Sequence, residues 1–265
     1  MKIQLIIVAL ATSSLPMSAA TVVNYSAGVA PTTGTTGASD PVTQGWSANG
    51  GATAFSHGLD SSNGGWRITD GTTQQPYFYQ QAISVSDAAA MAAGDWSATW
   101  TMTVNADAVN SGGGGVDEYY ASPNNGRQNN NAMWIEVSSS FRYILTYNVD
   151  ANNDIQITDG TNTFQISTAN NQLSQEIGAS FANHVTYTLS SSGGVVSLSD
   201  SLNGLHGVVA TSGAATQDRV LWGATSSGGQ GSTTWNSVNV QTVPEPTSSM
   251  LLGMAGVLLI LRRKK

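Results

Sequence analysis

Four consecutive residues carry the side chains best suited to hold a sugar. Asp117, Glu118, Tyr119 and Tyr120 combine two carboxylates with two aromatic rings, in a segment rich in asparagine. Aromatic faces stack on the C–H groups of sugar rings, and carboxylate or amide groups beside them read the hydroxyls. This segment is therefore a candidate ligand-binding loop, and the alternative is a linker whose tyrosines cover a sheet edge.

Trp235 is a second candidate for ligand binding. In a strand, alternate side chains point to opposite faces. Trp235 shares its parity with Ser237 and Asn239, whereas Val238 and Val240 have the opposite parity. The pattern predicts that the Trp235 ring lies on the less buried face of its strand. Five other tryptophans are predicted to lie in the core: Trp66, Trp96, Trp100, Trp134 and Trp222.

Residues for catalysis do not come together in the sequence. It has no G-x-S-x-G, H-E-x-x-H or phosphate-binding loop motif. A glycosidase needs two carboxylates that flank one bond. Glu136 stands alone on its expected strand, and Asp117 and Glu118 are adjacent, so a strand would turn them to opposite faces. We expect a non-catalytic protein, and the alternative is a secreted polysaccharide-degrading enzyme with an unrecognised carboxylate site. Three scattered histidines are interpreted as solitary surface residues: His57, His184 and His206.

No cofactor is predicted, and calcium is the metal to consider. Asp150 to Asp154 (DANND) begins like an EF-hand loop, but Ile155 and Thr161 occupy the sixth and twelfth positions, which require glycine and glutamate. Because Asp and Asn also favour turns, a hairpin is the better interpretation. Calcium bound by loop carboxylates such as Asp70 or Asp117 stays an open alternative, and no metal site is identified.

The charge distribution excludes one class of partner. All three lysines and two of the six arginines lie near the chain ends, so residues 21–242 hold four arginines and 15 acidic residues, a net charge of −11. Phosphate contacts require Lys and Arg, so neither nucleic acids nor anionic membrane surfaces are expected as partners. The absence of cysteine excludes disulfides and cysteine-ligated metals.

Apolar residues that alternate with polar ones predict an all-β fold. The pattern is clearest from Trp96 to Asn105, where large apolar residues alternate with Ser and Thr. Turn residues separate the runs, and hairpins are predicted at 150–154 and 191–194. The other predicted strands are Thr21–Tyr25, Trp66–Thr69, Tyr77–Ile83, Ala132–Val137, Tyr143–Val149, Thr163–Ser167, Val185–Ser190, Val195–Ser199, Val220–Ala224 and Trp235–Gln241. So many short strands indicate a two-sheet antiparallel β-sandwich formed by one domain, residues 21–242.

Three segments depart from the strand pattern. Asp87–Ala93 is predicted to be helical, with Ser86 as its N-cap and Gly94 as its stop. Ala27–Asn63 and Asp107–Asn131 are low in complexity and rich in Gly, Ser, Thr or Asn. Both are predicted to be long surface loops.

The first 20 residues have the parts of a secretory signal peptide. Lys2 precedes the apolar run Ile3–Ala11, and small residues follow at Ser18 and Ala20. This order predicts export by the Sec machinery and cleavage between Ala20 and Thr21.

The last 23 residues, 243–265, contain three further parts in order. The prolines of Val243, Pro244, Glu245 and Pro246 make that stretch stiff and extended. An apolar run follows, and a basic end of Arg262, Arg263, Lys264 and Lys265 stays on the cytoplasmic side of a membrane. As a helix, the 15 residues 247–261 span about 22 Å. This length is shorter than the hydrocarbon core of a bilayer, which is about 30 Å thick. The segment predicts a short transmembrane helix that anchors the chain transiently in the inner membrane.

This order of parts resembles the PEP-CTERM sorting signal. Proteins with such a tail are taken to be recognised and cleaved near the Pro-Glu-Pro by exosortase, a membrane transpeptidase. The resemblance implies exosortase as a partner, an anchored precursor, and a final location at the cell surface, outer envelope or extracellular matrix. An ordinary single-pass anchor after a proline-rich linker is the alternative.

A second resemblance covers residues 65–241. Trp66 to Gly71 (WRITDG), Tyr77-Phe78-Tyr79, Gly94-Asp95-Trp96, Trp222-Gly223 and the glycine-rich stretch before Trp235 look like exported concanavalin A-like, LamG-type jelly rolls. This implies two curved antiparallel sheets with loops or a concave face open to glycans. We therefore expect an exported protein that binds extracellular polysaccharide or serves as a structural or adhesive component.

Overall fold

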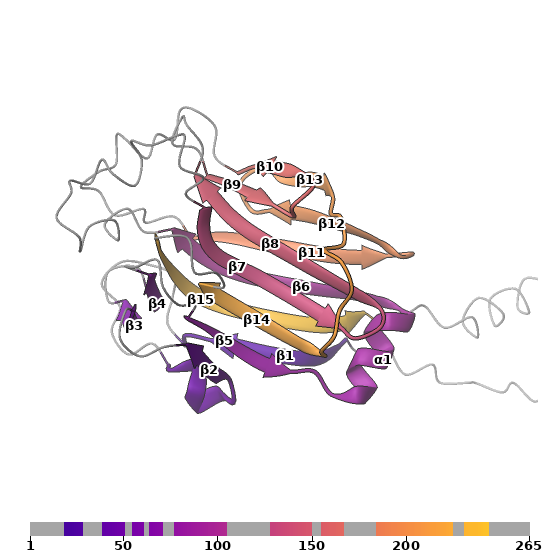
Figure 1. The fold of residues 1–265 in the computed structure, drawn as a ribbon, viewed down its shortest axis with the longest axis horizontal. Coiled ribbons are helices and arrows are strands. Elements are labelled where there is room, and N and C mark those ends of the chain that lie inside the picture. The colour runs from indigo at the N-terminus through magenta and orange to yellow at the C-terminus, as the bar shows by residue number, and fades with distance from the viewer. Residues whose placement is uncertain are drawn as a thin grey trace, which may run out of the picture.

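The computed structural model describes residues 19–28, 39–50, 55–60, 64–70, 77–104, 128–149, 155–166, 184–224 and 231–243. In this part of the chain two antiparallel sheets pack as layers into a β-sandwich (Figure 1), which confirms the predicted fold class. The signal peptide up to residue 18, the hairpin at 150–154 and the tail from Pro244 to Lys265 lie outside the described residues. Within the described ranges, no helix has the length and apolar character that a membrane crossing needs.

The first sheet, sheet A, has eight strands. Its order is β13-β12-β11-β6-β15-β4-β3, and β1 pairs with β15. The strands are β1 (Ala20–Ser26), β3 (Phe55–Asp60), β4 (Gly65–Asp70), β6 (Asp95–Val104), β11 (Val185–Ser192), β12 (Val195–Asp200), β13 (Gly204–Val208) and β15 (Gly231–Val243). The predicted hairpin at 191–194 joins β11 to β12.

The second sheet, sheet B, has seven strands in the order β10-β9-β8-β7-β14-β5-β2. They are β2 (Ser47–Gly50), β5 (Tyr77–Ala82), β7 (Gln128–Val137), β8 (Phe141–Val149), β9 (Ile155–Thr158), β10 (Thr163–Gln165) and β14 (Arg219–Ala224). Two short helices accompany the sheets: η1 (Pro41–Gln44) and α1 (Val85–Ala93).

Aromatic rings dominate the core between the sheets. Trp222 of β14 stacks on Tyr25 of β1 with ring centroids 5.0 Å apart, and it lies 5.1 Å from Trp235 of β15. The Trp100 indole of β6 donates a hydrogen bond to the Tyr147 hydroxyl of β8. Because every ladder pairs antiparallel neighbours, inward and outward side chains alternate on each strand, and the two inward sets meet in this core.

The segment 27–63 corrects one prediction. It was expected to be a long loop, yet it contains η1, β2 and β3, and Trp46 from it is buried in the core. Trp46 Nε1 donates to the Asn24 carbonyl, which fixes this segment against β1. The many glycines and serines of this segment hid its strands from the sequence pattern. The buried ring of Trp46 anchors the segment to the core. The predicted helix begins earlier than expected, because Ser84 rather than Ser86 is its N-cap.

A β-bulge in β15 corrects the prediction for Trp235. Trp235 pairs with Met102, but the next paired residue is Ser237, which lies opposite Thr101. Asn236 is the extra residue, so the side-chain parity reverses across it. Trp235 therefore points inward, as Val238 and Val240 do, and none of its surface is exposed. The prediction that Trp235 lies on the less buried face is wrong.

Candidate functional site

The residues predicted for ligand binding do not form a site within the described chain. Asp117, Glu118, Tyr119 and Tyr120 lie outside the described residues. Trp235 is a core residue whose indole nitrogen donates to the Thr233 hydroxyl, at 2.9 Å. The candidate surfaces for ligand binding are therefore the outward faces of the two sheets.

Over β6, β11 and the second half of β15, the outer face of sheet A carries small, uncharged side chains. Several of them bond to one another across strands, as Thr101 and Thr186 do with hydroxyl oxygens 2.9 Å apart. With no aromatic ring among them, these positions offer hydroxyl and amide groups but no stacking surface. The polar outward residues that form this surface are Ser97, Thr99, Thr101, Thr186, Thr188, Ser190, Ser197, Ser199, Ser237, Asn239 and Gln241. Arg67 on β4 and the exposed apolar residues Val195, Leu205 and Val208 on β12 and β13 lie on the same face.

The outer face of sheet B is aromatic, apolar and charged. Four neighbouring strands contribute to what we call the Trp134 face: Phe78, Gln80, Trp134, Arg142, Ile144 and Leu221. Each alternates with a buried core residue of its strand, so it points away from the core. All are partly exposed except Leu221, which is buried between its cross-strand partners Trp134 and Gln80.

Trp134 and Phe78 offer the stacking surface. Trp134 pairs with Leu221 on one side and Ile144 on the other, so its indole lies in a row of apolar side chains. The indole nitrogen is shielded from solvent and has no hydrogen-bond partner among the described residues, so the exposed part of the ring is carbon. Phe78 lies two strands away, roughly 10 Å across the sheet. Both rings lie on the same outer face of sheet B, and Phe78 is also offset from Trp134 by two residues along the strands.

A row of charged residues borders the Trp134 face. Arg219, Glu136 and Arg142 are direct cross-strand neighbours on β14, β7 and β8. Arg219 Nε donates to Glu136 Oε2 at 3.1 Å, and its Nη1 donates to Gln80 Oε1 at 2.9 Å. Arg142 Nη1 lies 3.9 Å from Glu136 Oε1. Glu136, which is 2% exposed, is thus held between two guanidinium groups.

The connection 209–218 packs beside this row of charged residues. It runs from β13 to the start of β14 past the ends of β7 and β8 (Figure 1). Ser212 N donates to the Arg142 carbonyl at 2.7 Å, and Arg142 Nε donates to the Ser212 carbonyl. Ser138 N donates to Asp218 Oδ1 at 2.6 Å. The reciprocal pair with Ser212 fixes the Arg142 side chain at the edge of the Trp134 face.

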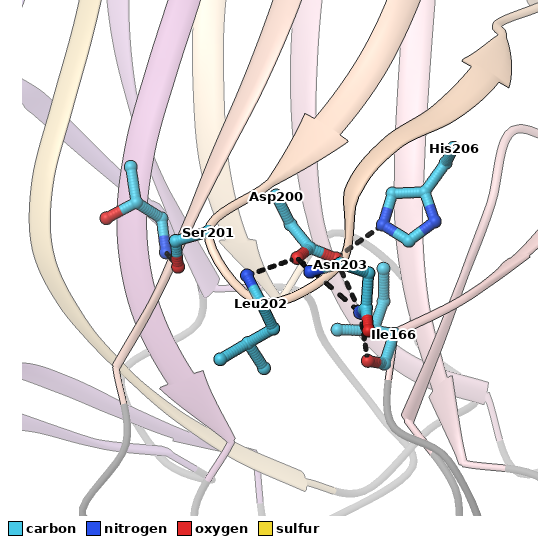
Figure 2. Close-up of polar contacts among 7 residues, drawn as sticks. Ile166, Asp200, Ser201, Leu202, Asn203 and His206 are labelled. Carbon is cyan, nitrogen blue, oxygen red and sulfur yellow. Dashed lines mark hydrogen bonds and ion pairs between the residues drawn. The ribbon is translucent and has the colours of Figure 1, made fainter.

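A second polar cluster surrounds Asp200 at the turn between β12 and β13 (Figure 2). Its carboxylate accepts hydrogen bonds from the backbone N–H groups of Leu202 and Asn203, from the Asn203 amide and from His206 Nε2. Burial alone would raise the pKa of Asp200, but the hydrogen bonds from Asn203, His206 and Leu202 outweigh burial and lower it. No Ser or Thr hydroxyl in the described part of the chain bonds to His206.

Asp159 repeats the same turn on the other sheet. Asp159 and Asn162 join β9 to β10 as Asp200 and Asn203 join β12 to β13, each as Asp-x-x-Asn. The Asp159 carboxylate accepts from Thr161 N, Asn162 N and Ala210 N. The Asn203 amide donates to the Ile166 carbonyl at 2.6 Å (Figure 2). The two turns therefore tie the edges of the two sheets together, and this cluster is structural.

The histidines are not the solitary surface residues that were predicted. His206 contacts Asp200, and the exposed His57 stacks on Tyr77 with ring centroids 4.5 Å apart. Both ring nitrogens of His184 are shielded and have no hydrogen-bond partner among the described residues. Burial lowers the pKa of His184 to about 4, against an opposing effect of Asp60. No three His, Asp or Glu side chains in the described part of the chain converge to hold a metal ion.

Trp134 and Arg142 are the functional candidates that the sequence interpretation missed. Trp134 was assigned to the core because it lies in the apolar run Ala132-Met133-Trp134-Ile135. It shares strand parity with Glu136, however, and a charged residue at that position indicates the outward face. The parity shared with Glu136 was therefore the available signal.

Solved structures place the fold among known β-sandwiches. A carbohydrate esterase, vb_24B_21, from the Shiga toxin-encoding bacteriophage phi24B has 16% identity and a TM-score of 0.55, over 86% of this chain and 100% of the other. The CBM2 module of an evolved Dit protein from Lactobacillus casei BL23 phage J-1 has 11% identity and a TM-score of 0.43, over 86% and 98%. The receptor binding domain of a botulinum neurotoxin C/D mosaic serotype has 7% identity and a TM-score of 0.46, over 89% and 51%. These likenesses concern the fold alone.

The sequence comparisons identify the end of the chain. No curated protein matches the sequence. Residues 242–265 match the PEP-CTERM protein-sorting motif, which confirms the resemblance seen in the tail. The motif indicates an exported, sorted protein with a membrane-anchored precursor, and it implies processing by an exosortase.

Proposed function

We propose that this exported protein binds extracellular polysaccharide through the Trp134 face and does not cleave it. The observation that carries the proposal is the partly exposed carbon surface of Trp134 and Phe78 on one outer sheet face, with Gln80 and Arg142 beside it. Sugar rings stack their C–H groups on aromatic faces, and amide and guanidinium groups bind their hydroxyls. The tail then delivers this binding face to the cell surface, outer envelope or extracellular matrix.

The electrostatics of the carboxylates support a non-catalytic role. Glu136 is 2% exposed and accepts from Arg219 Nε at 3.1 Å, so its carboxylate is engaged in an ion pair at the border of the Trp134 face. Asp200 and Asp159 accept hydrogen bonds from several donors and hold their turns. A glycosidase would need a second free carboxylate at a fixed distance from the first.

Glycan binding by Trp134→Ala tests the proposal. The full-length chain in mild detergent is titrated with a panel of polysaccharides, and released sugar is measured in parallel. We expect the variant to bind at least about tenfold more weakly, because the stacking surface is lost, and no sugar to be released. Thr188→Ala, on the outer face of sheet A, is the matched control and should bind as the parent does.

Two outcomes would replace the proposal. If the parent chain binds no glycan, a structural or adhesive role without a sugar ligand takes its place. If sugar is released and Glu136→Gln abolishes the release, the chain is a polysaccharide-degrading enzyme with a carboxylate site that the ion pair with Arg219 had concealed.

A further inference from the structure

We propose that Arg142 binds the carboxylate of an acidic sugar, so that the polysaccharides recognised by the Trp134 face contain uronic acids. This inference rests on the proposed function and names the ligand class of the same face. It follows from the hydrogen bonds that Arg142 makes and does not make, from its exposure, and from its place relative to Trp134.

Arg142 keeps most of its hydrogen-bonding capacity unused. A guanidinium group has five N–H donors. Nε donates to the Ser212 carbonyl, and the 3.9 Å from Nη1 to Glu136 exceeds hydrogen-bond length. The side chain of Arg142 is 30% exposed. Within the described chain its two Nη groups therefore make no hydrogen bond, and Nη2 lies beside Gly213, whereas Arg219 directs Nε and Nη1 to Glu136 and Gln80.

The charge of Glu136 is already matched without Arg142. The close partner of Glu136 is Arg219, at 3.1 Å, so Arg142 adds a positive charge beyond that pair. Two other carboxylates lie near the connection 209–218, and both face backbone N–H groups: Asp159 accepts from Ala210 N, and Asp218 accepts from Ser138 N. A carboxylate on the ligand would complete the coordination of the guanidinium group.

The position of Arg142 relative to Trp134 suits a single sugar residue. Arg142 pairs with Glu136, and Trp134 pairs with Ile144, so Arg142 is the diagonal neighbour of Trp134 across β7 and β8. Diagonal neighbours in a sheet are roughly 7–8 Å apart. A ring stacked on Trp134 thus brings a substituent within reach of the guanidinium. The planar fork of Arg matches a carboxylate in two parallel hydrogen bonds.

The net negative charge of residues 21–242 opposes the binding of acidic glycans. Residues 21–242 hold 15 acidic residues and four arginines, so the domain as a whole repels acidic polymers. A preference for an acidic over a neutral glycan therefore requires a local cation that outweighs this repulsion. Arg142 is the cation at the Trp134 face whose terminal donors are unused.

The test compares one glycan in two charge states. The full-length chain in mild detergent is titrated by calorimetry with oligogalacturonate and with its fully methyl-esterified form. We expect the parent to favour the acidic form by about tenfold or more. Arg142→Gln should abolish this preference, because it weakens binding of the acidic form much more than binding of the methyl ester. Arg67→Gln removes an arginine from the outer face of sheet A and should leave the preference unchanged.

Further variants and a second acidic polymer distinguish carboxylate recognition by Arg142 from the alternatives. Arg142→Lys keeps the charge without the fork and should lose most of the preference. If the parent and Arg142→Gln prefer the acidic glycan equally, the assignment of Arg142 is overturned. The proposed function is then tested by Trp134→Ala alone. If Trp134→Ala binds both forms as the parent does, the proposed function fails. Dextran sulfate bound as tightly as oligogalacturonate, with the same loss in Arg142→Gln, indicates recognition of charge and overturns the carboxylate assignment.

Discussion

At the scale of the residue, the buried aspartates have clear structural roles. Asp200 accepts hydrogen bonds from four donors within its turn, two of them backbone N–H groups that have no other acceptor in that turn. Asp159 is placed in the same way and reaches Ala210 of the connection that covers β8. Charge-assisted hydrogen bonds of this kind are about twice as strong as neutral ones.

Asp200→Asn tests this role. An amide keeps one acceptor oxygen and loses the charge, so we expect the variant to be less stable by about 1–3 kcal/mol at pH 7. The pKa of Asp200 is lowered on folding, so its stabilising effect is present above the unfolded value of about 3.9 and is lost as the pH falls through the folded value. Urea unfolding should give a larger difference from the parent at pH 7 than at pH 3. An equal difference at both pH values would contradict this account.

His184 predicts a second pH dependence, at milder pH. Burial lowers the pKa of His184 to about 4, below the unfolded value of about 6.5. Between these values the unfolded chain binds a proton that the folded chain does not, so stability is full above about pH 6.5 and declines toward pH 4. His184→Leu should flatten this decline in the urea midpoints at pH 7, 5.5 and 4.5. An unchanged slope in His184→Leu would contradict this account.

At the scale of the element, β15 explains what the sequence could and could not predict. Alternation predicted eleven strands near their observed places, because an apolar residue at every second position has a single stable orientation against a core. Asn236 then reversed the parity within β15, and a bulge leaves no mark in the hydrophobic pattern. The Trp235 prediction failed at that residue. The Trp134 face was missed for a related reason: Ala132 to Ile135 are apolar on both sides of β7, and only the parity that Trp134 shares with Glu136 indicated its outward side.

Close contact between β4 and β15 is a consequence of the bulge. A Cβ atom on Gly65 would lie 2.7 Å from the Trp235 carbonyl oxygen and 2.7 Å from Thr234 Cγ2. The backbone of β15 cannot move away, because Trp235 also pairs with Met102 on its other side. We expect Gly65→Ala to destabilise the protein by about 1–3 kcal/mol, as overpacking does. Gly193→Asn, at an open turn with φ of 59°, should change the thermal midpoint little, because Asn tolerates this conformation.

At the scale of the whole molecule, the outer faces of the two sheets carry different kinds of side chain. Sheet A presents hydroxyl and amide groups over β6, β11 and β15, and exposed apolar residues at its β12–β13 edge. Sheet B presents the aromatic rings and the arginine pair. The ladder between β1 and β15 pairs Ala20 with Thr242, so both signals join the sandwich at the same end of this strand pair. Removing both leaves the Thr21–Gln241 pair in place.

The position of the sorting motif yields the last prediction. The final ladder pairs of β15 are Thr242 with Trp96 and Val243 with Asp95, and Pro244 follows at once. Cleavage near Pro244, Glu245 and Pro246 therefore removes no hydrogen bond of either sheet, and processing and folding should be separable. In a host that contains exosortase, replacing these three residues by alanine should leave the chain in the membrane fraction at precursor mass, with an unchanged urea midpoint. Normal release of that variant would show that the Pro-Glu-Pro is not the recognised element, and a lowered midpoint would show that the tail contributes to the fold.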